Sequence, residues 1–180
     1  MSWQHDFFEI DLDQVPTPSL DPNWVASKGY PRQQQEQWIR HLGEIQRRMR
    51  EEGWRPEDFD RIRQGSEPSE RAIGESYHKF YHHDPSGERL NHDFIKLDWV
   101  GDHYEIVNGQ HRIWLAKQHG LRAMPAYVSA PDQATLDRLR MDGERAARMG
   151  REDPSTGRKP LWERRQSEEQ ERESHPSRER

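Results

Sequence analysis

The sequence predicts an α/β fold of the mixed α+β kind, in which a small mixed sheet is flanked by helices and carries a helical insert. Residues 7–12 and 104–107 alternate apolar and polar side chains, as half-buried strands do. Residues 33–52 repeat apolar side chains at spacings of three and four, as amphipathic helices do. The strand at 104–107 leads through a short helix to a further strand at 124–128. This order implies a crossover and therefore parallel or mixed pairing.

The first strand is followed by a proline-rich connection and then by the longest predicted helix. Pro16, Pro18 and Pro22 end the strand and begin an extended segment, because proline lacks a backbone donor. The helix at 33–52 ends at Gly53, a residue suited to the left-handed cap. Its predicted apolar stripe consists of Trp38, Leu42, Ile45 and Met49.

Two shorter helices complete the insert, which extends over about residues 33–83. Residues 56–64 are predicted to form a short helix with Phe59 facing inward. Ser69 is predicted to cap a third helix, which runs from residue 70 to about residue 82. The insert therefore separates the first strand from the rest of the sheet.

The second half of the chain is predicted to contain a hairpin, a short helix, a strand and a last helix. Residues 94–100 and 104–107 form the hairpin, with a glycine turn between them. The short helix covers residues 113–119 and is closed by Gly120. After the strand at 124–128, the S-x-x-D pattern at 129–132 is predicted to cap a surface helix that ends near Met149.

Length and composition favour one domain, residues 1–149, followed by a charged tail, residues 150–180. Of the 180 residues, 30% are hydrophobic and 34% are charged, so the core must be small. The tail has almost no apolar residue after Trp162. We expect it to be disordered, because it cannot bury enough apolar surface to offset the entropy cost of ordering.

Charge and cysteine content exclude several classes of function. The formal net charge of −5 argues against a generally basic nucleic-acid-binding surface. The absence of cysteine excludes disulfides, thiolate metal sites and cysteine nucleophiles. The first ten residues do not resemble a signal peptide, and no segment is apolar enough to span a bilayer. A cytoplasmic protein with no membrane partner is expected.

Residues 104–116 contain the clearest functional signal. Here a strand enters a helix through the turn Asn108-Gly109, and both residues tolerate a positive φ. Such a turn points backbone N–H groups outward at the positive end of the helix dipole, where an anion binds. His111 adds a titratable donor, and Arg112 adds a forked donor that suits phosphate. We therefore predict a phosphate or nucleotide site at Asn108, Gly109, Gln110, His111 and Arg112.

These residues resemble a family pattern. Residues 108–112, followed by Ala116, Gly120 and the Pro-Ala-Tyr-Val strand at 125–128, are similar to the loop and strand of the ParB/sulfiredoxin-like superfamily. The opening at residues 8–16 resembles the start of a ParB N-terminal domain, so the resemblance spans residues 7–128. It implies the mixed fold described above, with an added helical insert.

The resemblance also implies chemistry, residue by residue. In ParB proteins the matching loop binds the triphosphate of CTP; Gly109 and Arg112 match that loop, whereas Gln110, His111 and Trp114 depart from it. Sulfiredoxin has its reactive cysteine where Gln110 stands, so reduction of sulfinic acids is excluded.

The resemblance extends to two further positions, Asn108 and Arg32. Small-molecule kinases with this fold carry an acidic residue where Asn108 stands. The resemblance gives Arg32, which follows Tyr30-Pro31, the role of the arginine that ParB proteins carry near the end of their first loop, so Arg32 is included among the expected phosphate-binding residues.

Three functions follow from these expectations. The first is binding of a nucleotide or other phosphorylated ligand, with Mg²⁺ as the expected cofactor, and with NTP hydrolysis or phosphoryl transfer as the reaction. His111 and Glu105 are the catalytic candidates, although the alternation of the strand can also place Glu105 on the solvent face. The alternative is a structural turn in which Arg112 forms a salt bridge.

The second function is that of a ParB-like nuclease acting on DNA. The third is that of a non-catalytic adaptor whose C-terminal tail binds a protein partner. Histidine is abundant near the end of the insert and permits a metal site there, although a solvated loop is favoured. The residues concerned are His78, His82, His83, Asp84 and His92.

Overall fold

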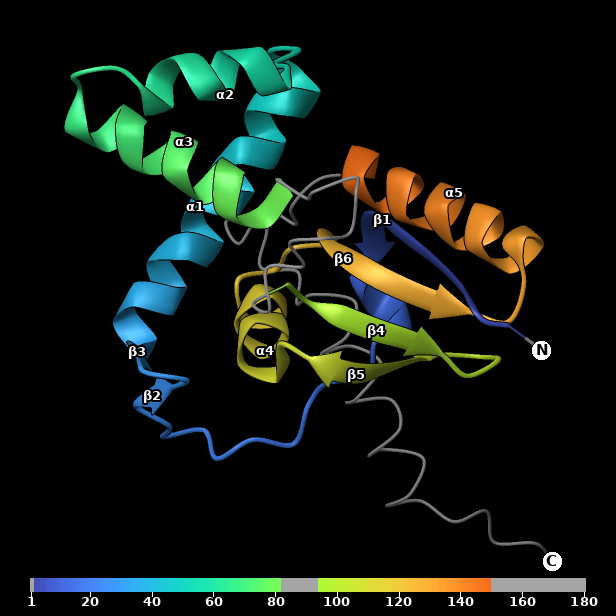
Figure 1. Cartoon of the computed structure of the whole chain (residues 1–180). Helices are drawn as coiled ribbons and strands as arrows, with labels where there is room; N and C mark the ends of the chain where they lie inside the picture. Colours follow the sequence, from blue (N-terminus) through green and yellow to red (C-terminus); the bar gives the residue numbers. More distant parts are fainter. Residues whose placement is uncertain (1, 82–93, 150–180) are drawn as a thin grey trace, which may run out of the picture.

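The computed structural model describes residues 2–81 and 94–149, and these residues confirm the predicted mixed α/β class. A four-stranded mixed sheet lies at the centre, with helices on both sides and a three-helix unit projecting from it (Figure 1). The strand order is β1-β6-β4-β5, and the strands are β1 (Gln4–Asp11), β4 (Lys96–Trp99), β5 (Tyr104–Asn108) and β6 (Ala123–Ala130). The helices are α1 (Arg32–Glu51), α2 (Pro56–Arg63), α3 (Pro68–Tyr81), α4 (Gln110–Gln118) and α5 (Gln133–Met149).

Strand β6 is an inner strand of the sheet and pairs antiparallel on one edge and parallel on the other. It runs antiparallel to β1, with Phe8 opposite Ala126, and parallel to β4, with Leu97 opposite Val128. The predicted hairpin is also present, as β4 and β5 pair antiparallel, with Trp99 opposite Tyr104. Because β6 has neighbours on both edges and cover on both faces, six of its eight residues are buried.

Helix α5 covers one face of the sheet along β1. Arg140 of α5 forms an ion pair with Asp6 and lies over the ring of Phe8, with its guanidinium carbon 5.5 Å from the ring centroid. The opposite face of β1 is met by the insert, since Glu9 accepts hydrogen bonds from Tyr81 of α3 and from Gln46 of α1. The sheet is therefore sandwiched between α5 and the insert at this edge.

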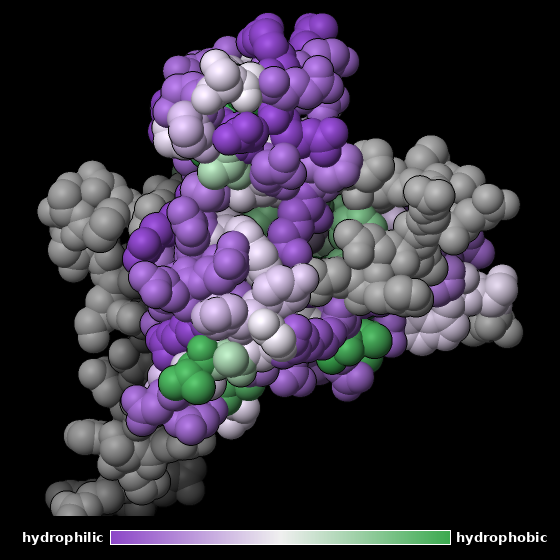
Figure 2. Space-filling view, turned by 60° about the vertical axis from the view of Figure 1, so that its left-hand side comes forward, coloured by the Kyte–Doolittle hydropathy of each residue, from purple (hydrophilic) through white to green (hydrophobic). Residues whose placement is uncertain are grey.

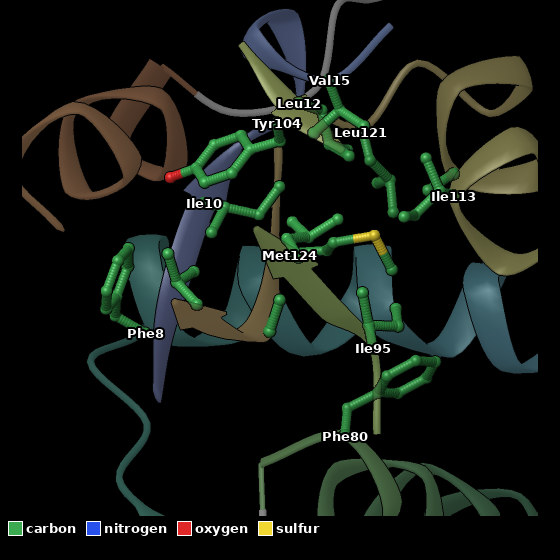
Figure 3. Packing of buried hydrophobic residues seen from close by; sticks show 14 of the residues in the cluster. Phe8, Ile10, Leu12, Val15, Phe80, Ile95, Tyr104, Ile113, Leu121 and Met124 are labelled. Carbon is green, nitrogen blue, oxygen red and sulfur yellow. The ribbon is translucent and has the colours of Figure 1, made fainter. Parts of the chain in front are cut away.

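The hydrophobic core lies where the strands meet the surrounding helices. Figure 3 shows Met124 of β6 at the centre of the labelled side chains, with Ile10 of β1 and Ile95 beside it. Ile113 of α4 and Phe80 of α3 extend the same cluster, which makes the core continuous from the sheet into the insert. Burial of these apolar side chains is the main stabilising term of the fold.

The insert consists of three helices, and the predicted apolar stripe of the first was partly wrong. Helix α1 buries Gln35, Ile39, Leu42 and Ile45. Trp38 and Met49 are only half-buried, because they flank this stripe rather than belong to it. Helices α2 and α3 pack through an aromatic stack in which the rings of Phe59 and Tyr77 lie 4.2 Å apart and nearly parallel. An ion pair joins α1 to α3, since both terminal nitrogens of Arg48 donate to Glu70, at 2.6 and 2.8 Å.

Two predicted helix caps were wrong. Helix α3 begins at Pro68, and its first turn is capped by the carboxylate of Glu67, which accepts from the N–H of Glu70 at 2.6 Å. Helix α5 begins at Gln133 and is capped by Asp132, the last residue of the predicted S-x-x-D pattern, and not by Ser129. Asp132 accepts from the N–H of Thr135 at 2.7 Å. In each case the capping side chain is the acidic residue nearest the helix start, where the helix dipole stabilises a negative charge.

The space-filling view shows the character of the side that carries α1. In Figure 2 this side is mostly hydrophilic, with a few small hydrophobic patches. Such scattered apolar residues are usual for a protein surface. Within residues 2–81 and 94–149, no helix combines the length and the apolar character that a membrane crossing requires. The predicted tail, residues 150–180, lies outside the described residues, so the division into domain and tail stays a prediction.

Candidate functional site

The predicted anion site lies where β5 passes into α4. Gly109 is the N-cap residue of α4 and has a φ of 104°, a conformation that glycine adopts without strain. The predicted start of the helix at residue 113 was wrong, because α4 begins at Gln110. The first bond within the helix runs from the N–H of Ile113 to the carbonyl of Gly109, at 3.0 Å. The N–H groups of Gln110 and His111 therefore precede the helical ladder and lie at the positive end of the helix dipole.

A short hairpin faces this turn and was not predicted. Strands β2 (Ala26–Ser27) and β3 (Tyr30–Pro31) are joined by Lys28 and Gly29, whose φ angles of 51° and 81° are typical of a two-residue hairpin loop. Gln35 of α1 holds the hairpin in place. Its amide is buried and donates to the carbonyls of Ser27, at 3.4 Å, and of Tyr30, at 3.2 Å.

Side-chain hydrogen bonds join the hairpin to the turn, although about 80 residues of sequence separate them. Ser27 Oγ lies 3.0 Å from His111 Nδ1. Lys28 Nζ donates to Asn108 Oδ1, while the Nδ2 of Asn108 donates to the carbonyl of Phe94, at 2.7 Å. Asn108 thus links the hairpin to the start of β4, and the turn is held from two sides.

Between the hairpin and the turn lies a cavity of about 320 Å³, which we call the α4 cavity. It is lined by Ser27, Lys28, Tyr30, Gln35, Trp38 and residues 107–112. Lys28 and Arg112 contribute positive charge, and none of the described residues in this lining is acidic. In a chain with a net charge of −5, this local excess of positive charge favours an anionic ligand.

His111 is the titratable residue of the cavity. Burial, and in second place the positive charge of Lys28, lower the pKa of His111 below its usual value. The imidazole is therefore neutral at pH 7, and one of its nitrogens can accept a proton. The ring of Trp24 packs against it edge-on, with the ring centroids 4.6 Å apart, and fixes its orientation.

Aromatic side chains form another part of the lining. The rings of Tyr30 and Trp38 meet edge-to-face, with their centroids 4.9 Å apart. Lys79 of α3 lies over Trp38, with Nζ 4.1 Å from the ring centroid. Such rings offer a face on which a base or another planar group can stack.

Arg32 does not line the α4 cavity. Its guanidinium lies between the rings of Trp24 and Trp114, 5.1 Å from each centroid, and donates to the carbonyl of Pro22 at 2.7 Å. It also pairs with Glu36. Arg32 therefore fastens the proline-rich connection to α1 and α4, and the structure gives it no contact with the predicted anion site.

Glu105 and the predicted histidine cluster also lie apart from the cavity. Glu105 is exposed on β5 and is not among the lining residues, in agreement with the solvent-face alternative. Within the described ranges, no group of three or more His, Asp or Glu side chains has the arrangement of a metal site. Of the histidine cluster only His78 is described, and residues 82–93 lie outside the described ranges.

Six lining residues were missed from the sequence: Ser27, Lys28, Tyr30, Gln35, Trp38 and Val107. The one available signal was Gly29 followed by Tyr30-Pro31, since glycine in a short polar segment marks a turn. Nothing in the local pattern indicates that this turn packs against residues 108–112.

No protein-family model, curated protein or solved structure matches the chain. The chemistry of the α4 cavity is therefore the basis for the functional proposal.

Proposed function

We propose that this chain is a cytoplasmic ParB/sulfiredoxin-like protein that binds the phosphate groups of a nucleotide or another phosphorylated ligand in the α4 cavity. One observation carries the proposal. The cavity combines the uncapped N-terminus of α4 with Lys28, His111 and Arg112, and it has no acidic residue in its described lining. Backbone N–H groups at a helix start and guanidinium or ammonium groups are the usual partners of phosphate in proteins.

The aromatic rings favour a nucleotide over inorganic phosphate. Tyr30 and Trp38 belong to the same lining as the phosphate-binding groups, so a base can stack while the phosphates contact α4. A volume of about 320 Å³ is at the lower end of the range for small-molecule sites, which suits the phosphates and part of a nucleoside. Mg²⁺ would enter with the phosphates as their counter-ion.

The decisive experiment is a calorimetric titration with CTP, ATP and GTP in the presence of Mg²⁺, and with pyrophosphate as the ligand without a base. We expect saturable binding of at least one nucleotide, and tighter binding of that nucleotide than of pyrophosphate. If none of these ligands binds, the cavity is not a phosphate site.

Replacing Lys28 with glutamine should weaken this binding about tenfold, which corresponds to one charge-assisted hydrogen bond of about 1.5 kcal/mol. Lys28 is exposed, and Asn108 keeps its hydrogen bond to the carbonyl of Phe94 when Lys28 is replaced, so the overall fold should be unaffected. Arg61→Gln is the matched control, because it removes one charge from an exposed position on α2, away from the cavity. Equal affinities for the two variants would contradict the role of Lys28.

Affinity should also rise as the pH falls from about 7.5 to about 5.5. In the ligand-free protein burial and Lys28 hold the pKa of His111 below its usual value, so the ring is neutral at pH 7. A bound anion favours the protonated ring and raises this pKa. Ligand binding therefore takes up a proton, and the affinity increases as pH decreases.

His111→Asn is the control for this pH dependence, because the titration of the ligand itself affects both proteins equally. The difference between the two pH profiles isolates His111. Superimposable profiles would show that His111 does not contact the anion.

A further inference from the structure

Three serine–histidine hydrogen bonds occur in the described residues, and one of them lies in the α4 cavity. Ser27 Oγ is 3.0 Å from His111 Nδ1. The other two pairs are Ser76 with His41 and Ser129 with His5, each at 2.7 Å. A hydroxyl within hydrogen-bond reach of an imidazole is the arrangement in which histidine acts as a general base toward a nucleophile. The serine–histidine distance alone does not show which of the three pairs is reactive.

The surroundings of the three serine–histidine pairs distinguish Ser27 and His111 from the other two. Only Ser27 and His111 line the cavity that also contains Lys28 and the N-terminus of α4. Attack on phosphorus requires both an activated hydroxyl and groups that stabilise negative charge on the phosphoryl oxygens. The first requirement is met when the His111 ring is neutral, because a protonated ring cannot accept the hydroxyl proton; the transfer should therefore proceed at a pH above the pKa that His111 has with the donor bound.

We propose that Ser27 is a nucleophile that accepts a phosphoryl group from a phosphoanhydride or phosphate ester bound in the α4 cavity, with His111 as its general base. This inference rests on the proposed function, since the donor must occupy the same cavity. It assigns a catalytic role to Ser27, for which the sequence pattern gave no indication.

His111 Nδ1 takes the proton of the Ser27 hydroxyl, and Oγ forms a bond to the phosphorus. The bond between phosphorus and the bridging oxygen breaks, and its electron pair remains on the leaving group, which is a nucleoside diphosphate when the donor is a nucleoside triphosphate. The imidazolium then releases its proton to solvent. Lys28 and the N–H groups of Gln110 and His111 are the available partners for the phosphoryl oxygens.

The hairpin is suited to holding a nucleophile. Ser27 is fixed through its own carbonyl, which accepts from the buried amide of Gln35, and through its hydroxyl, which contacts His111. It precedes Lys28, whose positive φ places the following chain in a tight turn. A side chain that is held at both backbone and hydroxyl needs little reorganisation before it reacts.

The test uses a fluorophosphonate probe, whose phosphorus is attacked by an activated serine with loss of fluoride. The full chain is incubated with the probe, and the modified peptide is identified by mass spectrometry. We expect an adduct on Ser27 and none on Ser129, which is half-buried like Ser27 and is the matched serine–histidine control within the same molecule. Ser76 is buried, so no adduct is expected there on grounds of access alone. His111→Asn should slow the labelling of Ser27 about a hundredfold, the scale of general-base catalysis, and Ser27→Ala should abolish it.

The outcomes distinguish this inference from the proposed function, because the nucleotide and pyrophosphate titration is carried out on the same preparation. Binding of a nucleotide without labelling of Ser27, or with labelling unaffected by His111→Asn, would overturn the nucleophile and leave the phosphate site intact. Equal labelling at Ser27 and Ser129 would overturn it as well. The absence of any binding would overturn both. Circular dichroism of each variant tests whether the fold is retained.

Discussion

Replacing Gly109 with alanine is expected to lower the free energy of unfolding by about 3 kcal/mol and to abolish ligand binding in the α4 cavity. Two costs combine at this position. The φ of 104° is a conformation that side chains rarely adopt. In addition, a Cβ atom would lie 2.8 Å from Cγ1 of Ile95, which is buried and cannot move away freely. If the backbone changes its φ or moves away from Ile95, the first turn of α4 rotates and the N–H groups of Gln110 and His111 are displaced.

Gly101→Ala is the matched control for this prediction. Gly101 has a similar φ of 112° in the turn between β4 and β5, but a Cβ atom there would have no neighbour within 4 Å. We expect this variant to lose about 1 kcal/mol, the conformational cost alone, and to bind ligand normally. Urea unfolding and titration calorimetry measure the two effects. A Gly109→Ala variant that binds as tightly as Gly101→Ala would show that the turn geometry is not needed for the site.

Replacing Gly143 with alanine should lower the free energy of unfolding by about 3 kcal/mol or more, which corresponds to a drop in Tm of about 10 °C. Gly143 lies on the face of α5 that contacts β1. A Cβ atom would lie 1.6 Å from the carbonyl oxygen of Glu9 and 3.1 Å from the Cα of Ile10. These are backbone atoms of a paired strand, so the helix itself must move. That movement would separate α5 from the sheet and expose core residues such as Leu139.

Gly43→Ala is the control for this prediction, because the same substitution at another helical glycine should not lower the free energy of unfolding. Gly43 also lies inside a helix, α1, but its Cβ would make an ordinary contact at 3.4 Å with the Leu121 side chain. Alanine is the better helix former by about 1 kcal/mol, so this variant should be as stable as the wild type or more stable. Thermal unfolding of the two variants measures the contrast. If Gly143→Ala is also neutral, α5 does not pack on β1 at the described distance.

The local structure around the site was largely predictable from the sequence. Asn108-Gly109 marked the turn, and the alternation of residues 104–107 marked the strand before it. The helix start was misplaced by three residues, because Gln110, His111 and Arg112 are polar and do not show the periodicity of a buried helix. Arg112 is nevertheless buried in the structure. Polar residues at a helix start are positioned by backbone geometry, which a hydrophobic pattern cannot reveal.

Arg32 does not lie where the family resemblance implied. The residue was expected among the phosphate-binding groups, and the structure instead places it between Trp24 and Trp114. Its hydrogen bonds to Pro22 and Glu36 are made within the connection and the first turn of α1. Lys28, four residues earlier, is the cation that reaches the cavity. The conformation of the hairpin decides that Lys28, and not Arg32, reaches the cavity. That conformation depends on Gln35 of α1, whose amide donates to two carbonyls of the hairpin.

The sequence by itself determined the mixed α/β class, the helical insert and the turn at Gly109, because strand alternation, helix periodicity and glycine conformation are properties of neighbouring residues. Only the tertiary structure decided that β6 lies between β1 and β4, and that Ser27 and Lys28 face His111 and Asn108. These contacts join residues about 80 positions apart. They form because packing of α1 against α4 brings the hairpin to the turn, and no local pattern encodes that distance.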